Sequence, residues 1–208
     1  MNIFKYIENT SYKIAHMIGK NDSQDDVELY EYSVFMILSN CFTILSGLIL
    51  SLILGYYKAY IVCTISYIML RTVGGGQHCD TFQKCFFVSN IVIIICCIFS
   101  YISLSHPAIL WIVSTILSIN IIPICPKPSI NSPSRGYSED TKFRKKFAAR
   151  LSFLLGLSLV FIYLDLFLLS TSISAGILIL CFVLTDTGES VISKIFHIAY
   201  INNKLGKD

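Results

Sequence analysis

Long apolar runs separated by short polar segments dominate this chain of 208 residues. A helix that crosses the hydrocarbon core of a bilayer needs about 20 mostly apolar residues. Hydrophobic residues make up 54% of the chain and charged residues only 14%, whereas a soluble domain is about 25% charged. The sequence therefore predicts an all-α, polytopic integral membrane protein that forms a single membrane-embedded domain over residues 1–208.

The apolar runs predict about six transmembrane helices, of which the second and the last are short. These runs cover residues 33–55, 59–73, 86–104, 108–125, 151–170 and 173–185. A further segment, residues 191–200, is amphipathic and is expected either to extend the last span or to lie at the membrane interface. Asp165 is expected inside the fifth span, where an acidic side chain is costly and often functional.

The distribution of lysine and arginine predicts which side of the membrane each connection faces. Cytoplasmic connections carry an excess of these cations. Residues 126–150 hold seven of them, whereas residues 56–58 and 105–107 hold one lysine between them. We therefore expect a multi-pass protein of the cell (cytoplasmic) membrane, with both termini, the basic loop 126–150 and the polar stretch 71–85 on the cytoplasmic side.

Residues 1–31 predict a cytoplasmic lead-in to the first span. No segment here has the apolar core and small-residue cleavage site of a signal peptide, so the N-terminus is expected to stay in the cytoplasm. Apolar residues interleaved with lysines are typical of an amphipathic helix on the inner leaflet. An ordinary solvated helix explains the pattern equally well. The apolar residues concerned are Ile3, Phe4, Ile7, Ile14 and Ile18.

The most polar stretch beside an apolar run is RTVGGGQHCDTFQKC, residues 71–85. Each glycine inside a helix costs about 1 kcal/mol relative to alanine, so the second span is expected to end at Gly74–Gly76. The glycines are not a phosphate loop, because the GxGxxG spacing and a preceding strand are absent. A new helix is expected to begin near Thr81.

A histidine and a cysteine in this stretch suggest thiol catalysis. Histidine can take the thiol proton and later protonate a leaving amine. On one straight helix His78 and Cys85 would be separated by a rise of about 10 Å, whereas a direct hydrogen bond needs about 3 Å. A dyad therefore requires a break between them. Cys79 is a competing nucleophile, and a merely packed histidine and cysteine are the structural alternative.

The remaining cysteines predict no metal or disulfide chemistry. Most of the eight lie in apolar runs, where cysteine behaves as a small hydrophobic residue, and no CxxC pair occurs. His78, Cys79, Asp80 and Cys85 form one cluster of possible ligands, whereas structural zinc sites use two separated pairs. We expect reduced thiols, no metal and no cofactor.

The pattern R-x3-GG-x-H-x6-C, formed by Arg71, Gly75, Gly76, His78 and Cys85, resembles the signature of the accessory gene regulator B family. These are membrane cysteine endopeptidases of bacterial quorum sensing and virulence regulation. The resemblance extends to chain length, six spans and a basic loop. It implies that Cys85 is the nucleophile, that His78 is the general base and acid, and that Arg71, Gly75 and Gly76 support them.

The resemblance also implies a substrate, a small precursor peptide with an amphipathic N-terminus and an acidic C-terminal tail. Cys85 would form an acyl-thioester as the C-terminal segment leaves, and a thiol or hydroxyl of the peptide would then close a thiolactone or lactone. The acidic tail suggests a binding role for a basic cluster, although positive-inside topology alone also explains it. A homodimer, contact with membrane lipid and no nucleic-acid partner are implied. The cluster comprises Lys142, Arg144, Lys145 and Lys146.

Two other functions compete with the enzyme. A membrane peptide transporter or exporter without proteolytic chemistry would distribute polar residues over several spans near the midplane, whereas this sequence concentrates them at one edge. A non-enzymatic scaffold or sensor would leave His78 and Cys85 merely packed.

Overall fold

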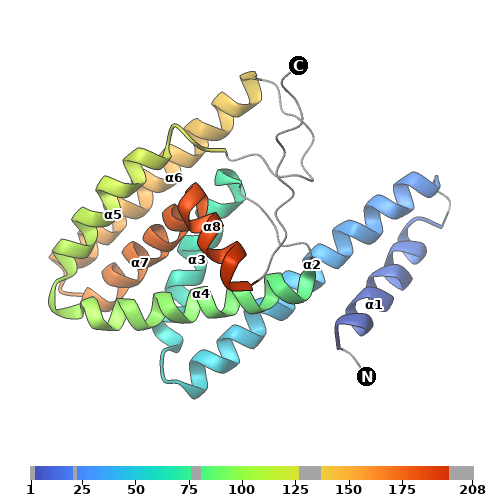
Figure 1. The fold of residues 1–208 in the computed structure, drawn as a ribbon, viewed down its shortest axis with the longest axis horizontal. Helices are drawn as coiled ribbons and strands as arrows, with labels where there is room; N and C mark the ends of the chain where they lie inside the picture. Colours follow the sequence, from blue (N-terminus) through green and yellow to red (C-terminus); the bar gives the residue numbers. More distant parts are fainter. Residues whose placement is uncertain (1–2, 21–22, 76–80, 127–136, 197–208) are drawn as a thin grey trace.

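The computed structural model is an assembly of helices (Figure 1). It describes residues 3–20, 23–75, 81–126 and 137–196. Within these ranges no β-strand occurs. The predicted all-α class is therefore confirmed.

Four helices in the described ranges are long and apolar enough to cross a membrane. They are α2 (Gln24–Ile53), α4 (Phe82–Ile102) with its following turn, the part of α6 (Tyr137–Tyr163) from Asp140 onward, and α7 (Phe167–Leu184). Two further helices, α3 (Tyr57–Gly74) and α5 (Pro107–Ile121), occupy the positions of the second and fourth predicted spans. Each of the six predicted spans thus corresponds to a helix, and the membrane class is supported.

The predicted boundary between the fifth and sixth spans is wrong. Helix α6 ends at Tyr163 and α7 begins at Phe167, so α7 has 18 residues and the shortest of the six helices is α5 with 15. Asp165 lies exposed in the connection between α6 and α7, with φ 58°, and not inside a span. Hydropathy could not find this turn, because its other residues are apolar. Aspartate is one of the few residues that tolerate the left-handed region.

The N-terminal region differs from the predicted lead-in over residues 1–31, because α2 already begins at Gln24. Ser23 caps this helix, its Oγ accepting a hydrogen bond from the Asp26 backbone N–H at 3.3 Å. The acidic run that follows forms the first turns of α2, where carboxylates favour the helix N-terminus. Thirty residues at about 1.5 Å each give about 45 Å, longer than the hydrocarbon core of about 30 Å.

Helix α1 (Ile3–Ile18) is the predicted amphipathic helix, and part of its apolar surface packs on α2. It runs antiparallel to the first part of α2, away from the remaining helices (Figure 1). Ile7, Ser11 and Ala15, spaced four residues apart, are buried on the side facing α2. Contact with α2 buries Ile7 of the predicted apolar face, whereas Ile18 is 62% exposed, so contact with the inner leaflet stays a prediction.

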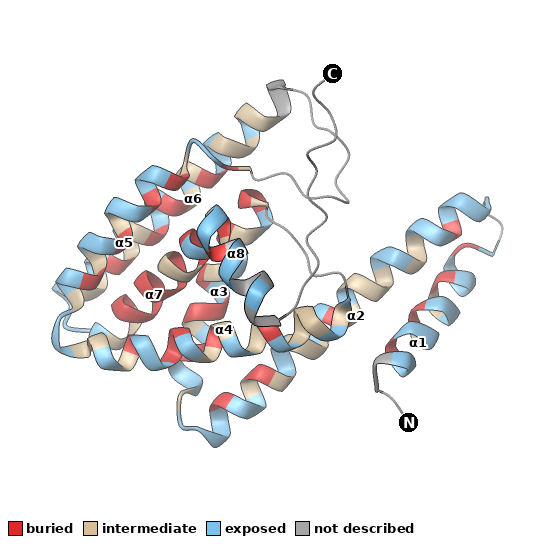
Figure 2. Cartoon of the chain, viewed as in Figure 1, coloured by how far each residue is buried: buried red, intermediate tan, exposed pale blue. Residues whose placement is uncertain are grey.

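Helix α7 forms the centre of the helical bundle (Figure 2). It contacts α3, α4, α5 and α6, and Ile177 and Leu180 are fully buried. Its buried hydroxyls find partners: Ser158 of α6 lies 2.9 Å from the Ser170 hydroxyl and 3.0 Å from the Ser174 hydroxyl. Lipid tails are as apolar as leucine side chains, so the hydrophobic effect does not bring helices together inside a membrane. Small side chains and hydroxyl pairs of this kind contribute to helix association there.

The segment after α7 is a separate helix, α8 (Asp186–Phe196), and not a continuation of the last span. Thr185 interrupts the two helices with an extended backbone, φ −77° and ψ 153°, and its Oγ1 accepts a hydrogen bond from the Gly188 N–H at 3.0 Å. Residues 197–200 of the predicted amphipathic segment lie outside the described ranges.

Candidate active site

The end of α3 leads into the segment that holds His78. The helix stops at Gly74, and Gly75 has φ 69° and ψ −147°, a conformation that side chains other than hydrogen disfavour. The Arg71 guanidinium Nη1 donates a hydrogen bond to the Gly75 carbonyl oxygen at 2.5 Å. The predicted break at the glycines is therefore confirmed, and Arg71 fixes the direction in which the chain leaves the helix.

The start of α4 follows this segment and carries Cys85. Thr81 precedes the helix with φ −131° and ψ 147°, and its Oγ1 accepts from the Lys84 N–H at 3.5 Å. The Cys85 N–H donates to the Thr81 carbonyl at 3.1 Å, which closes the first turn. Cys85 thus lies at the positive end of a helix, where a thiolate is favoured.

The extended Thr81 also means that positions 78 and 85 do not share one straight helix. A direct contact between the two side chains required such a break. His78, Gly76 and the competing Cys79 themselves lie outside the described residues, as do Gln77 and Asp80. Their placement in the site therefore remains a prediction.

Exposure distinguishes Cys85 from five of the six other described cysteines. Cys85 is half-buried and Cys41, on α2, is exposed, whereas the remaining five described cysteines are buried. Burial also raises the pKa of the Cys125 thiol, in the connection after α5, to about 12, although the neighbouring Arg144 acts in the opposite direction. Among the cysteines in the described ranges, Cys85 is the one that is both accessible and in the first turn of a helix.

Phenylalanine side chains hold the first turns of α4 against α2. Phe82 makes an edge contact with Phe35 at 5.6 Å between ring centroids, and Phe86 stacks on Phe42 at 5.2 Å. Cys85 lies between Phe82 and Phe86 in the sequence, so this packing fixes its helical turn. The sequence interpretation missed these contacts, because phenylalanine inside an apolar run carries no sign of its partner.

The basic segment before the fifth span is mostly helix. Residues from Tyr137 onward belong to α6, so the predicted loop 126–150 is a helix over its second half. Arg144 Nε donates to the Cys125 carbonyl at 3.1 Å, and Arg150 Nη1 donates to the Met69 carbonyl at 2.8 Å. Arg144 thus joins α6 to the connection after α5, and Arg150 joins α6 to α3, where the Met69 carbonyl also accepts from the Thr72 hydroxyl.

Three lysines of α6 remain exposed beside this packing: Lys142, Lys145 and Lys146. Phe147, on the same segment, is fully buried against Gly74 at the end of α3. The exposed lysines therefore lie on the same helix as the residue that packs on the end of α3, within five positions of it. Of the predicted tail-binding cluster, Arg144 has an intramolecular partner and the three lysines face outward.

The described residues contain no group of three or more histidine, cysteine or acidic side chains arranged to hold a metal ion. Three of the four possible ligands named from the sequence, His78, Cys79 and Asp80, lie outside these ranges.

Comparison with known families adds the last observation. The sequence model of the family described as Accessory gene regulator B matches residues 11–184, which includes α2 to α7 and every described residue of the site. Neither the curated proteins nor the solved structures give a match. The family is associated with processing of a precursor peptide in quorum sensing.

Proposed function

The chain belongs to the accessory gene regulator B family, and on this basis we propose that it is a membrane cysteine endopeptidase that cleaves and cyclises a small autoinducer precursor peptide. The observation that carries the proposal is the half-buried Cys85 in the first turn of α4, a few residues along the chain from the end of α3 that Arg71 fixes. Five of the other described cysteines are buried, and the sixth, Cys41, does not lie at a helix start.

The first half of the reaction breaks a peptide bond. His78 takes the proton from Cys85 Sγ, and the thiolate attacks a backbone carbonyl carbon of the precursor. The tetrahedral intermediate collapses as the C–N bond breaks, and the imidazolium returns its proton to the departing amine. The C-terminal segment leaves, and the remaining peptide is held on Cys85 as a thioester.

The second half closes the ring. A thiol or hydroxyl of the bound peptide attacks the thioester carbonyl, the bond to Cys85 breaks, and the proton of the attacking group passes through His78 to the Cys85 sulfur. Exchange of one thioester for another is nearly balanced in energy, so a thiol enzyme suits cyclisation. Water must be kept from the intermediate, and the apolar phenylalanine contacts around the first turns of α4 serve that purpose.

Arg71 acts as a positioning residue in this scheme. Its guanidinium donates to the Gly75 carbonyl, two residues before Gln77 and three before His78. The hydrogen bond sets where the 76–80 segment begins and hence how His78 approaches Cys85. Gly75 takes part through its positive φ, and Gly76 is assigned a supporting role by the family signature alone.

The exposed lysines of α6 offer a site for an acidic tail. Lys142, Lys145 and Lys146 project from a helix whose Phe147 packs against Gly74, so an anionic segment bound there would lie close to the site. Contact with anionic lipid is the competing use of the same charges. We place this end of the molecule in the cytoplasm, because cytoplasmic connections carry the excess of lysine and arginine.

The test is co-expression with the candidate precursor peptide. We expect the intact protein to accumulate a covalent adduct of the peptide that hydroxylamine releases, as it does for thioesters. Cys85→Ala and His78→Ala should abolish both the adduct and cleavage, while Cys41→Ala, which removes the other accessible described cysteine, should leave them unchanged. Cleavage that persists in Cys85→Ala, with normal membrane insertion, would overturn the proposal.

A further inference from the structure

A groove lies at the end of the helices far from Cys85. It has a volume of about 480 Å³ and opens to the surroundings between α3 and the turn that joins α6 to α7. Lys58 and Ile61 line it from α3, and residues 165–169 line it from the turn and the start of α7. The lining is therefore apolar except for one cation and one anion.

The two charged side chains in the groove are unused. Lys58 and Asp165 are both exposed, and within the described ranges neither forms an ion pair or a side-chain hydrogen bond. The Asp165 carboxylate does not serve the turn either, because backbone bonds close it: Asp165 N–H donates to Ile162 at 3.1 Å and Leu166 N–H donates to Phe161 at 2.9 Å. Both charges remain available to a ligand.

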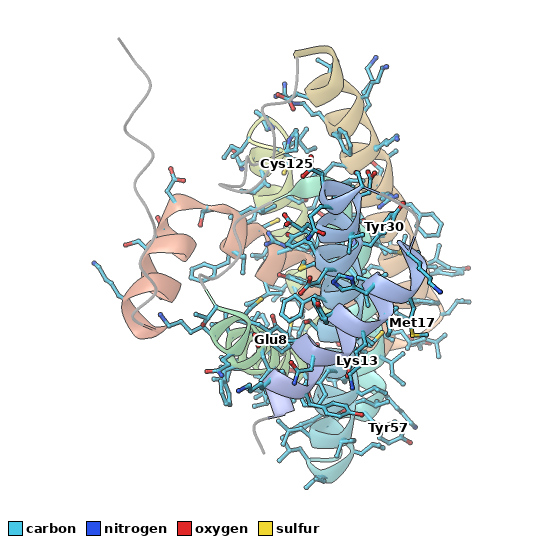
Figure 3. All side chains as sticks on the ribbon, turned by 90° about the vertical axis from the view of Figure 1, so that its right-hand side faces the viewer. Glu8, Lys13, Met17, Tyr30, Tyr57 and Cys125 are labelled. Carbon is cyan, nitrogen blue, oxygen red and sulfur yellow. The ribbon has the colours of Figure 1, made fainter. Side chains whose placement is uncertain are left out.

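Aromatic residues place the groove at the depth of lipid headgroups. Tyr57 lies at the opposite end of the molecule from Cys125 (Figure 3). Tyr56 packs on Tyr101 at 5.0 Å between ring centroids, and Tyr163, two residues before Asp165, is 87% exposed. Tyrosine is enriched where a membrane meets water, so this end of the helices lies in the interface.

We propose that the groove binds the headgroup of a zwitterionic phospholipid that carries a primary ammonium group. Its phosphate pairs with Lys58, its ammonium donates hydrogen bonds to the Asp165 carboxylate, and the adjoining acyl chain packs on Ile61 and Leu169. Complementarity favours this class, because a headgroup with only negative charge would leave Asp165 facing a like charge. A quaternary ammonium has no N–H to donate to the carboxylate.

The test measures lipid retained by the purified full-length protein. The protein is placed in bilayer discs that hold equal amounts of phosphatidylethanolamine and phosphatidylglycerol, and the lipids that stay bound after release are counted by native mass spectrometry. We expect enrichment of phosphatidylethanolamine. Lys58→Gln and Asp165→Asn should each lower that enrichment by about two- to fivefold, the effect of an exposed charge pair. Lys58→Arg should keep it.

Asp25→Asn, which neutralises an exposed carboxylate in the first turn of α2, is the matched control and should leave the enrichment unchanged. Equal retention of the two lipids, or enrichment that both Lys58→Gln and Asp165→Asn leave intact, would overturn the proposal. So would equal retention of phosphatidylcholine in place of phosphatidylethanolamine, because its ammonium cannot donate to Asp165.

Discussion

The ring of Phe147 lies against Gly74, so close that a Cβ on Gly74 would meet the ring carbon Cε2 at 3.0 Å. Gly74 ends α3, and Phe147 is fully buried on α6. The contact joins the helix that carries the exposed lysines to the helix end that leads into the proposed catalytic segment. It therefore couples the two parts of the candidate site through packing.

We expect Gly74→Val to disturb this junction, because the larger side chain must displace a fully buried ring. Overpacking of a filled core costs about 1–3 kcal/mol. Thermal denaturation in detergent should show a lower midpoint, and precursor processing should fall. Phe147→Leu should restore part of both in the double variant, since it removes the atoms in conflict. Gly156→Val is the control, because a Cβ at Gly156 meets nothing within 4 Å.

A second prediction concerns Arg71. Arg71→Gln removes the guanidinium that donates to the Gly75 carbonyl, so His78 should approach Cys85 less well. Small misplacements of catalytic groups cost up to about 100-fold in rate. In single-turnover measurements, we therefore expect the Cys85–peptide adduct to appear about 10- to 100-fold more slowly. Alkylation of Cys85 by iodoacetamide at high pH, where the free thiolate no longer needs His78, should change little.

If Arg71 were needed only for folding, adduct formation and high-pH alkylation would change together, and thermal stability would drop with them. Arg71→Lys keeps the charge but not the planar pair of donors. It should therefore recover the rate only in part.

The sequence predicted the positions of the helices better than the residues at which they end. The apolar runs located the six helices α2 to α7, because the length and composition of a span are local properties. They missed the turn at Asp165, where the neighbours Leu164 and Leu166 are as apolar as a span. They also could not show that α1 packs on α2, since a helix that faces lipid and a helix that faces protein have the same amphipathic pattern.

In the candidate site, too, local features could be predicted from the sequence and long-range contacts could not. The glycine break and the helix start near Thr81 follow from local backbone preferences, and both are present. The hydrogen bond from Arg150 to Met69 joins residues 81 positions apart, and the contact between Phe35 and Phe82 joins residues 47 apart. Single-residue patterns carry no information on such long-range partners. The pairing of His78 with Cys85 stays a prediction from chemistry and family signature.

A third prediction follows from cysteine exposure. A water-soluble maleimide should modify Cys85 in the folded protein and leave Cys63, Cys96, Cys97, Cys125 and Cys181 unmodified, because these five are buried. Peptide mapping of the labelled protein by mass spectrometry gives the sites, and Cys79→Ser removes the nearby competing thiol. Modification of Cys125 before Cys85 would contradict the exposures on which the choice of nucleophile depends.

The last prediction separates binding from folding on α6. Lys145→Glu with Lys146→Glu reverses two exposed charges and should raise KM for a precursor with an acidic tail while leaving kcat and thermal stability nearly unchanged. Loss of binding that is equal in ground and transition states has this signature. Because exposed charges are screened by salt, the difference from the wild type should shrink as salt is raised. Arg144→Gln should instead lower thermal stability, and salt should change this effect little, because the substitution removes the donor to the Cys125 carbonyl. Unchanged KM in the lysine variant, with correct membrane topology, would assign these charges to topology and lipid contact alone.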